Sequence, residues 1–392
     1  MKYAIITPTY TEHFIYIDKY LKSFVKYVED KKDIPIYFII SLNEKETFEK
    51  IIGKYRESID IKILFIEYLF ELNKIKETPA EFLEKYGRFT FQTAKKFYSM
   101  INIDAEKYFV LDCESMWVRK TNMTKLFEDY FKSPFLVTSK IEKEKRVDYV
   151  FNSMLNNIEY ILDMPQNTRW FIEHNMWFYE KSILEDLFKQ YGTLYSMIQK
   201  LALYNHNLKL QNKLKYGIFE IVLYYAFIYK NNNKYKYKHY DINAILEENI
   251  PQDILIDYYN KFYEKYQGST GIIEQYMSLL TEDNWQYFTD VFKKLGLKVV
   301  RCQYININQY KPLNNFMDIV QPDILACSQE HIFGINNNPT NKFLMFAPHD
   351  KLEKHFYQFI KACCAAFSNL VSSLFYLSKN IFWVIKNLDK LL

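Results

Sequence analysis

Glycine is the residue that this sequence most clearly lacks. Only 8 of its 392 residues are glycine, roughly 2% against the ~7% of an average protein. Neither GxGxxG nor GxxxxGK[ST] occurs, so the glycine-lined phosphate cradles of dinucleotide-binding and P-loop proteins are excluded. A nucleotide bound by this chain must have its phosphates neutralised by a metal ion or by basic side chains.

The five cysteines indicate neither a zinc ribbon nor a disulfide framework. None of them stands in a CxxC pair, which is the spacing that would point to such a site. The opening MKYAIITPTY has one lysine and a short apolar run before Thr7, which is not the pattern of a secretory signal peptide. We therefore expect a protein of the reducing cytoplasm.

A large surplus of charge is also absent. Lys and Arg number 51 against 47 Asp and Glu, a formal net charge of +4, which is too small to make nucleic acid the expected partner. Hydrophobic residues make up 49% of the chain, enough to bury a sizeable core. The length fits one large domain with an appendage, or two domains.

Short apolar runs alternate with amphipathic segments over the first 140 residues. The spacing predicts strands at 3–6, 36–40, 61–66, 108–111 and 135–138, and helices at 18–28, 44–55 and 91–101. Strands that alternate with helices are typical of a mostly parallel sheet with helices on both faces. We therefore predict an α/β fold that binds its ligand at the carboxyl ends of the strands.

One predicted strand ends in two carboxylates. The apolar run 108–111 is followed by Asp112, Cys113 and Glu114. Alternate residues of an extended segment point the same way, so Asp112 and Glu114 can share one ligand. Mn²⁺ or Mg²⁺ bridging a diphosphate suits these hard oxygen ligands. Helix capping or solvation is the alternative for such carboxylates, and Cys113 beside two acids should be a poor nucleophile.

The opening 4–10 together with Leu111–Glu114 resembles the glycosyltransferases of GT-A fold. The resemblance implies a GT-A-like (Rossmann-like) sheet whose first strand ends at the nucleotide base, and a DxD-like motif that holds a metal ion on the diphosphate of a sugar nucleotide. It implies donor-binding roles for Thr7, Thr9, Tyr10 and Asp112. The usual second Asp of that motif is Glu114 here, whose longer arm changes where a metal would lie.

Gln92 and Lys96 extend the resemblance to a narrower family of bacterial surface-glycan glycosyltransferases. Its members carry a Gln and, four residues later, a Lys on the helix before the acidic motif. Residues spaced in this way are neighbours on one helical face, so Lys96 could neutralise donor phosphate; an ordinary surface lysine is the alternative. Arg88, Gln92 and Lys96 are all predicted donor-binding residues.

The same family has a His-containing segment, which here is Glu173–Met176. GT-A enzymes often complete the metal shell with a downstream His, so the resemblance makes His174 a candidate third ligand after Asp112 and Glu114. The alternative is a lone His that only forms hydrogen bonds. The resemblance covers about residues 1–235 and leaves the remainder unexplained.

Glu220 is the most informative single residue. The run 217–229 contains no other charge, so on a helix Glu220 should lie in a largely desolvated place, and Glu is almost never buried unpaired. A desolvated carboxylate suits a general base that takes the proton from an acceptor hydroxyl. The alternative is a structural ion pair or hydrogen bond, with Arg88, Arg169 or a Tyr as partner.

The residue pattern changes in the C-terminal part of the chain, from residue 236 onwards. Residues 236–355 are expected to form a mainly helical accessory or acceptor region. No charge occurs from Ala362 to Ser378, yet serines and an asparagine interrupt that run. An amphipathic membrane-interface helix is expected for the tail 356–392. A terminal helix docked on the domain and a homodimer contact are the alternatives.

The pattern as a whole predicts a metal-assisted glycosyltransferase with a catalytic domain at 1–235. It would move a sugar from a nucleotide-sugar donor to a hydroxyl of a bacterial surface glycan, such as capsule or lipooligosaccharide, with a lipid-linked oligosaccharide as one form of the acceptor. The expected location is the cytoplasm, peripheral to the inner face of the cytoplasmic membrane, and a homo-oligomer is compatible with the sequence. A sugar nucleotidyltransferase and a non-catalytic membrane-associated scaffold are the alternatives.

Overall fold

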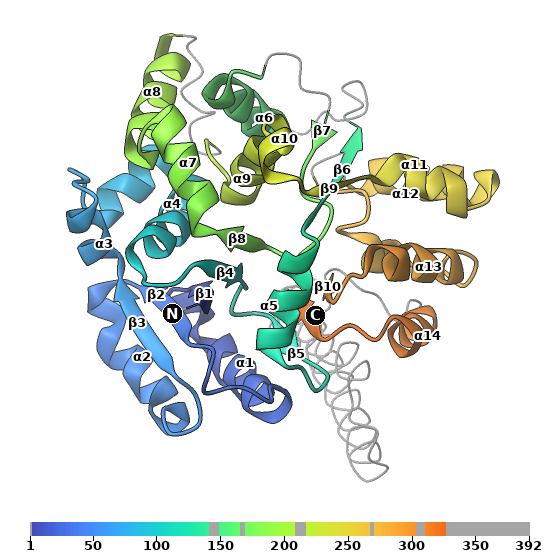
Figure 1. The fold of residues 1–392 in the computed structure, drawn as a ribbon, viewed down its shortest axis with the longest axis horizontal. Helices are drawn as coiled ribbons and strands as arrows, with labels where there is room; N and C mark the ends of the chain where they lie inside the picture. The colour runs from blue at the N-terminus through green and yellow to red at the C-terminus, as the bar shows by residue number, and fades with distance from the viewer. Residues whose placement is uncertain are drawn as a thin grey trace, which may run out of the picture. The chain divides into compact units, whose positions relative to one another are not determined.

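The structure is a computed structural model that describes residues 2–140, 149–164, 169–207, 217–266, 270–302 and 310–326 (Figure 1). All of these belong to one compact unit, residues 1–329. The predicted tail 356–392 lies outside the described residues, as does the end of the predicted region 236–355. No helix in the described part is long and apolar enough to cross a membrane.

The central sheet has the strand order β3-β2-β1-β4-β8. Its strands are β1 (Tyr3–Pro8), β2 (Ile36–Ile40), β3 (Ile61–Phe65), β4 (Lys107–Val110) and β8 (Phe178–Glu180). The first four run parallel, and β8 is antiparallel to β4. The predicted fold class, a mostly parallel α/β sheet flanked by helices, is therefore confirmed.

Helices cover both faces of this sheet. Phe38 of β2 packs on one face against Tyr20 and Phe48, with ring centroids 5.9 and 5.1 Å apart. Its neighbour Ile39 belongs to the hydrophobic cluster of the other face, together with Phe97. In Figure 1, α1 and α2 lie on one side of the sheet and α4, α7 and α9 on the other. Burial on both faces explains why β2 is a continuous apolar run.

Helices surround the central sheet in the described part of the chain. They are α1 (Phe14–Tyr27), α2 (Lys45–Ile52), α3 (Ile66–Leu72), α4 (Pro79–Asn102), α5 (Met123–Lys132), α6 (Tyr149–Leu162), α7 (Lys181–Tyr191), α8 (Leu194–Asn207), α9 (Glu220–Lys230), α10 (Asn232–Tyr235), α11 (Ile242–Asn249), α12 (Gln252–Tyr266), α13 (Trp285–Leu295) and α14 (Tyr310–Val320). Short 3₁₀ turns are η1 (Thr11–His13), η2 (Leu42–Glu44), η3 (Gly53–Tyr55) and η5 (Tyr276–Leu279).

Two small sheets tie later segments to the first 140 residues. One has the order β10-β11-β5, formed by β10 (Val299–Arg301), β11 (Ile324–Ala326) and β5 (Met116–Trp117); the other has the order β7-β6-β9, formed by β7 (Arg169–Trp170), β6 (Phe135–Lys140) and β9 (Lys238–Asp241). The predicted strand 135–138 therefore exists but lies outside the central sheet. The predicted boundary after residue 235 falls just before β9, which pairs with β6.

Helix α4 is longer than the predicted helix 91–101 and has a break inside it. It begins with a capping box in which Thr78 and Glu81 exchange hydrogen bonds, and Pro79 occupies its first turn. Gly87 interrupts it with φ +82° and ψ 169°, a conformation essentially restricted to glycine. The second half therefore starts on a new axis, and it carries Gln92 and Lys96.

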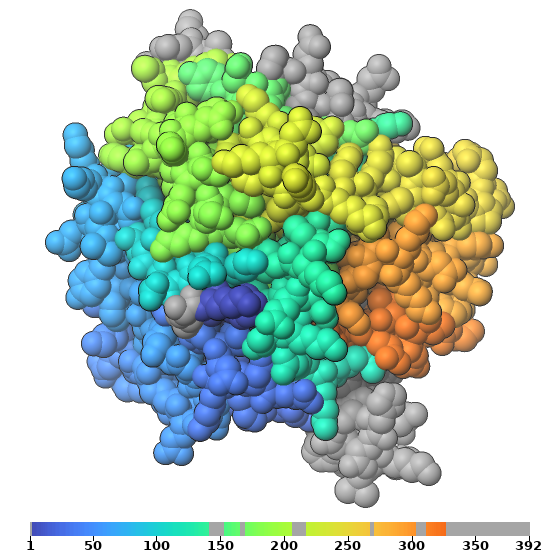
Figure 2. Space-filling model, in the orientation of Figure 1, coloured from blue at the N-terminus to red at the C-terminus, as the bar shows by residue number. Residues whose placement is uncertain are grey.

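Little of the N-terminal segment is visible in the space-filling view (Figure 2). The darkest blue atoms, from the N-terminal segment that includes β1, form one small area surrounded by later segments (Figure 2). Tyr3–Ile6 are all buried, with Ala4, Ile5 and Ile6 fully inaccessible. Because β1 lies at the centre of the sheet, the loop after it starts in the interior and reaches the surface only at Tyr10.

Candidate functional site

The carboxyl end of β1 meets the acidic motif after β4. The side chain of Thr7 is fully buried and its Oγ1 lies 2.9 Å from the hydroxyl of Tyr20. Thr9 is also buried, and its Oγ1 lies 3.4 Å from Sγ of Cys113. These two predicted donor-binding side chains hold β1 against its neighbours. Tyr10, which is 38% exposed, is the one whose side chain reaches the surface.

The D-x-E motif pairs with a residue that the sequence did not single out. The carboxylate of Glu114 is nearly buried, and its Oε1 lies 3.1 Å from Nδ1 of His13. The other ring nitrogen of His13, Nε2, lies 2.6 Å from the hydroxyl of Tyr10. His13 thus links a predicted donor-binding residue to a predicted metal ligand. The one sequence signal for this contact is that His13 follows Tyr10 by three residues, a spacing that a single turn brings together.

Lys96 and Glu220 form a buried ion pair at the same place. Lys96 is 2% exposed and Glu220 is fully buried; their Nζ and Oε1 atoms are in direct contact. The second carboxylate oxygen of Glu220, Oε2, accepts a hydrogen bond of 3.1 Å from Thr93. Nζ of Lys96 also lies 4.0 Å from Oδ1 of Asp112. The structure therefore brings together three of the predicted site residues.

Two aromatic rings lie beside the lysine of this ion pair. Nζ of Lys96 lies 5.3 Å from the ring centroid of Trp177 and 5.8 Å from that of Phe219, within reach of cation–π attraction. Asp112, whose side chain is 34% exposed, is the member of the group that faces solvent. The arrangement places a buried cation directly behind an accessible carboxylate.

The expected partners of Glu220 need correcting. Arg169 forms its ion pair with Asp241, at 2.6 Å from Nη1 to Oδ2. Arg88 is exposed and its guanidinium lies over the ring of Phe89, 5.1 Å from the centroid. The partner of Glu220 is instead Lys96, one of the residues predicted to bind the donor. The desolvation that the sequence predicted for Glu220 is confirmed, since its exposure is 0%.

Lys95 is a second buried lysine, which the sequence did not reveal. It is 4% exposed, and its Nζ donates a 2.9 Å hydrogen bond to the carbonyl oxygen of Thr9. Burial lowers the pKa of Lys95 to about 8, against the opposing effect of Glu44 and Glu67. Lys95 thus fixes the backbone of the segment that carries Tyr10 and His13. Two adjacent lysines gave no signal of burial, because lysine normally lies at the surface.

Tyr10, Arg88 and Gln92 lie around this group. Burial is the main cause that raises the pKa of the Tyr10 phenol, aided by the charges of Glu12 and Glu114 and opposed by that of Arg88. Gln92 lies one turn before Lys96 on α4 and is partly exposed. Cys113 is buried, and that burial raises its thiol pKa, as expected of a poor nucleophile.

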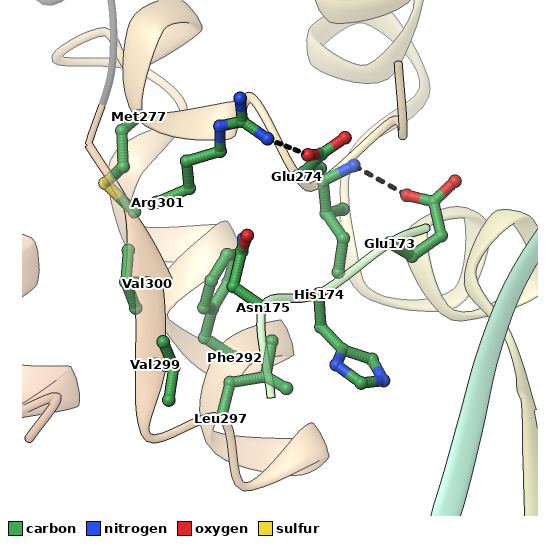
Figure 3. A pocket seen from close by; sticks show the side chains of 11 residues that line it. Glu173, His174, Asn175, Glu274, Met277, Phe292, Leu297, Val299, Val300 and Arg301 are labelled. Carbon is green, nitrogen blue, oxygen red and sulfur yellow. Dashed lines mark hydrogen bonds and ion pairs between the residues drawn. The ribbon is translucent and has the colours of Figure 1, made fainter. Parts of the chain in front are cut away.

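His174 lies in different surroundings from Asp112 and Glu114. It lines a small cavity with residues of η5 and β10, and its ring points away from Arg301 and Glu274 (Figure 3). Its Nδ1 accepts a 3.1 Å hydrogen bond from the backbone of Met176, and burial lowers its pKa to about 3. The cavity measures about 10 Å³, room for roughly one water molecule.

Asp112 and Glu114 are the carboxylates that remain as candidate ligands of a divalent cation. The described part of the chain contains no group of three or more His, Cys, Asp or Glu side chains that could hold a metal ion, so the predicted set of Asp112, Glu114 and His174 is not assembled. Mg²⁺ is usually bound through one or two carboxylates together with substrate phosphates and water. Asp112, whose side chain is partly exposed, matches that pattern; Glu114 is two residues further along the chain, with its carboxylate at His13.

Among known proteins, similarity is found at the level of structure. No protein-family model and no curated protein matches the sequence. Matching solved structures include mouse xyloside xylosyltransferase 1 in its apo form, at 12% identity and TM-score 0.36 over 68% of this chain and 94% of that one. The glycosyltransferase GlyE of Streptococcus pneumoniae TIGR4 matches at 12% identity and TM-score 0.35 over 94% of this chain and 64% of that one.

A third match is residues 1–349 of Staphylococcus aureus TarS in complex with UDP-GlcNAc, at 16% identity and TM-score 0.28 over 47% of each chain. At these TM-scores the likenesses carry no argument of their own. Any function assigned to this chain therefore rests on its own residues and on the topology of its sheet.

Proposed function

We propose that the chain is a glycosyltransferase. More particularly, it would transfer a sugar from a nucleotide-sugar donor to a hydroxyl group of a bacterial surface glycan. The observation that carries the proposal is the buried Lys96, whose Nζ lies 4.0 Å from Oδ1 of Asp112 at the carboxyl end of β4, where parallel sheets bind their ligands. Glu114 follows Asp112 by two residues, and its carboxylate faces His13. A basic side chain and two hard ligands are what a diphosphate needs in a chain without a glycine-rich cradle.

The main task of these residues in the reaction is to stabilise the negative charge of the departing nucleoside diphosphate. The bond from the anomeric carbon to the donor phosphate breaks, a bond to the acceptor oxygen forms, and the acceptor hydroxyl loses its proton. The departing nucleoside diphosphate gains negative charge, so stabilising that charge in a preorganised site is the largest catalytic term available. Lys96 is already desolvated and held in place, and therefore acts on that charge without reorganising.

A bound Mn²⁺ or Mg²⁺ would supply further neutralisation of the diphosphate. Asp112 would hold it through its accessible carboxylate, with Glu114 as the second protein ligand. Glu114 also faces His13, which keeps that carboxylate oriented. Tyr10 and Arg88, at the rim of the group, would contact the donor.

Glu220 has two candidate roles in this scheme. As the predicted base it would take the proton of the acceptor hydroxyl. The contacts favour the other role, because Oε1 faces Lys96, Oε2 faces Thr93, and none of the side chain reaches solvent. A carboxylate held in this way keeps Lys96 charged and extended towards Asp112. Glu220 then acts through Lys96, as a positioning residue.

The proposal is tested most cheaply by a thermal-shift screen. The protein would be heated with UDP-, GDP- and CMP-sugars, each with and without Mn²⁺. One donor class should raise the melting temperature, and more so with the cation, because ligands that bind only the folded state stabilise it. A nucleotidyltransferase should respond instead to a nucleoside triphosphate, and a non-catalytic scaffold should respond to none of these compounds.

A further inference from the structure

A second cleft lies apart from the carboxylate group, where α7 turns into α8. It has a volume of about 440 Å³, within the roughly 300–1,000 Å³ range of small-molecule sites. Its lining residues are Tyr160, Ile161, Gln190, Tyr191, Gly192, Met197 and Lys200. Gly192 makes the turn at φ +93°, and a Cβ there would lie 2.5 Å from Oγ of Ser196. The wall of the cleft therefore depends on a glycine.

An aromatic ring held by stacking lines the cleft. Tyr160 is 45% exposed. Its ring stacks on that of Tyr204, with centroids 3.9 Å apart and planes inclined by 14°. The stacking fixes the plane of the exposed ring. The face of an aromatic ring carries negative potential, which attracts the weakly positive C–H bonds that line one side of a pyranose ring.

Groups that can both donate and accept hydrogen bonds lie beside this ring. The amide of Gln190 donates a 3.2 Å hydrogen bond to the hydroxyl of Tyr191, which donates in turn to the carbonyl of Leu162 at 3.2 Å. The remaining amide atoms of Gln190 suit hydroxyl groups, which also donate and accept. The described lining has one charged residue, Lys200, and no carboxylate, so a neutral or acidic sugar fits better than a cationic ligand.

Helix α9 connects this cleft to the candidate active site. It begins at Glu220 and ends at Lys230, whose Nζ donates to the carbonyls of Leu162 and Asp163, next to Tyr160 and Ile161. Its 11 residues span roughly 16 Å. Residues 220–228 of α9 are all buried, so an oligosaccharide that occupied both places would pass over the surface of the protein and not along this helix.

We propose that this cleft binds the distal sugar residues of an oligosaccharide acceptor. The inference rests on the proposed glycosyltransferase function and adds to it that the acceptor is a chain, recognised away from its reacting end. The sugar chain itself is the ligand, so free and lipid-linked forms of one oligosaccharide should bind alike.

The test is binding to an array of bacterial-type oligosaccharides, read for wild type and four variants. Wild type should retain at least one glycan. Tyr160→Ala and Gln190→Ala should each bind it roughly tenfold more weakly or worse, whereas Tyr160→Phe keeps the ring face and should bind nearly normally. Tyr68→Ala removes a tyrosine on α3 that is 52% exposed, similar to Tyr160, and should change nothing.

Three outcomes would overturn the proposal: no glycan retained by the wild type, equal binding by Tyr160→Ala and Tyr160→Phe, or retention of lipid-linked forms alone. Hydrolysis of the sugar-nucleotide donor is measured on the same preparations. It should be unchanged in Tyr160→Ala, which also shows that the variant is folded. If the wild type binds a glycan but hydrolyses no donor, the cleft still binds sugar residues, and the proposed transferase function is contradicted.

Discussion

Buried charge dominates the candidate site at the scale of single residues. The sequence predicted that Lys96, Asp112 and Glu220 belong to one site, and the structure places all three within one group of contacts. It could not predict that Lys96 would itself neutralise Glu220, because pairing across residues 96 and 220 depends on how α9 packs against α4. Arginines were the more obvious partners from residue type alone.

The role of Glu220 can be decided with one substitution and two measurements. Glu220→Gln leaves the Lys96 cation buried without its counter-charge, and the loss of one partner from a buried ion pair costs roughly 3–5 kcal/mol. We therefore expect a clear fall in the free energy of unfolding. A base would instead show a drop in kcat of about 10²–10⁴ with stability preserved.

The double variant Lys96→Met, Glu220→Leu is the matched control. Replacing a buried pair by apolar residues of similar size restores most of the stability, but it should not restore turnover, because the cation behind Asp112 is gone. A Glu220→Gln protein as stable and as active as the wild type would contradict both roles.

Lys95 gives a prediction with a definite pH window. Its pKa of about 8 in the folded protein lies below the ~10.4 of an unfolded lysine, so the unfolded state binds more protons between these values. The cost of burying the cation is fully present below pH 8 and is relieved as pH rises towards 10.4. Wild type should gain stability relative to Lys95→Met by roughly 1.4 kcal/mol per pH unit in that window.

The measurement is urea unfolding of both proteins at pH 7, 8, 9 and 10. Lys50→Met removes a lysine that is 73% exposed, and its stability difference from wild type should stay nearly constant over the same range. A difference for Lys95→Met that is equally flat would show that the Lys95 cation is not desolvated.

At the scale of elements, hydrophobic periodicity predicted that the strands exist but not which sheet each strand joins. The five strands predicted in the first 140 residues all exist, because each is a short and mostly apolar run. The two-residue strand β5 was not predicted. The strand 135–138 joins β7 and β9 instead of the central sheet, since its partners are residues far along the chain. The start of α4 was missed because Gly87 splits its apolar pattern into two helices on different axes.

Gly87 should be the most sensitive position of α4. Its φ of +82° is strained for any residue with a Cβ, so Gly87→Ala should destabilise the protein by about 1–3 kcal/mol. The change should also weaken donor binding, because Arg88 and the following turns start from this bend. Gly53→Ala is the control: its φ is −51° and nothing lies within 4 Å of an added Cβ. Equal melting temperatures for the two variants would show that the bend is not required.

At the scale of the whole molecule, segments beyond residue 235 are part of the same unit as the candidate site. β9 pairs with β6 and β11 pairs with β5, which follows the acidic motif by one residue. Sequence patterns treated 236–355 as a separate region because nothing local reveals such long-range pairing. The tail 356–392, proposed to bind a membrane surface, should be removable without loss of donor binding.

Calorimetric titration of the donor identified by the screen, in the presence of Mn²⁺, tests the central claim most directly. Asp112→Asn keeps the shape of the side chain at a partly exposed strand end and removes its charge, so the fold should be retained while binding weakens by at least tenfold. Removing the cation with EDTA should weaken binding by the wild type to a similar degree and should hardly affect the variant. Donor affinity that is the same in both proteins, with and without the cation, would contradict the account.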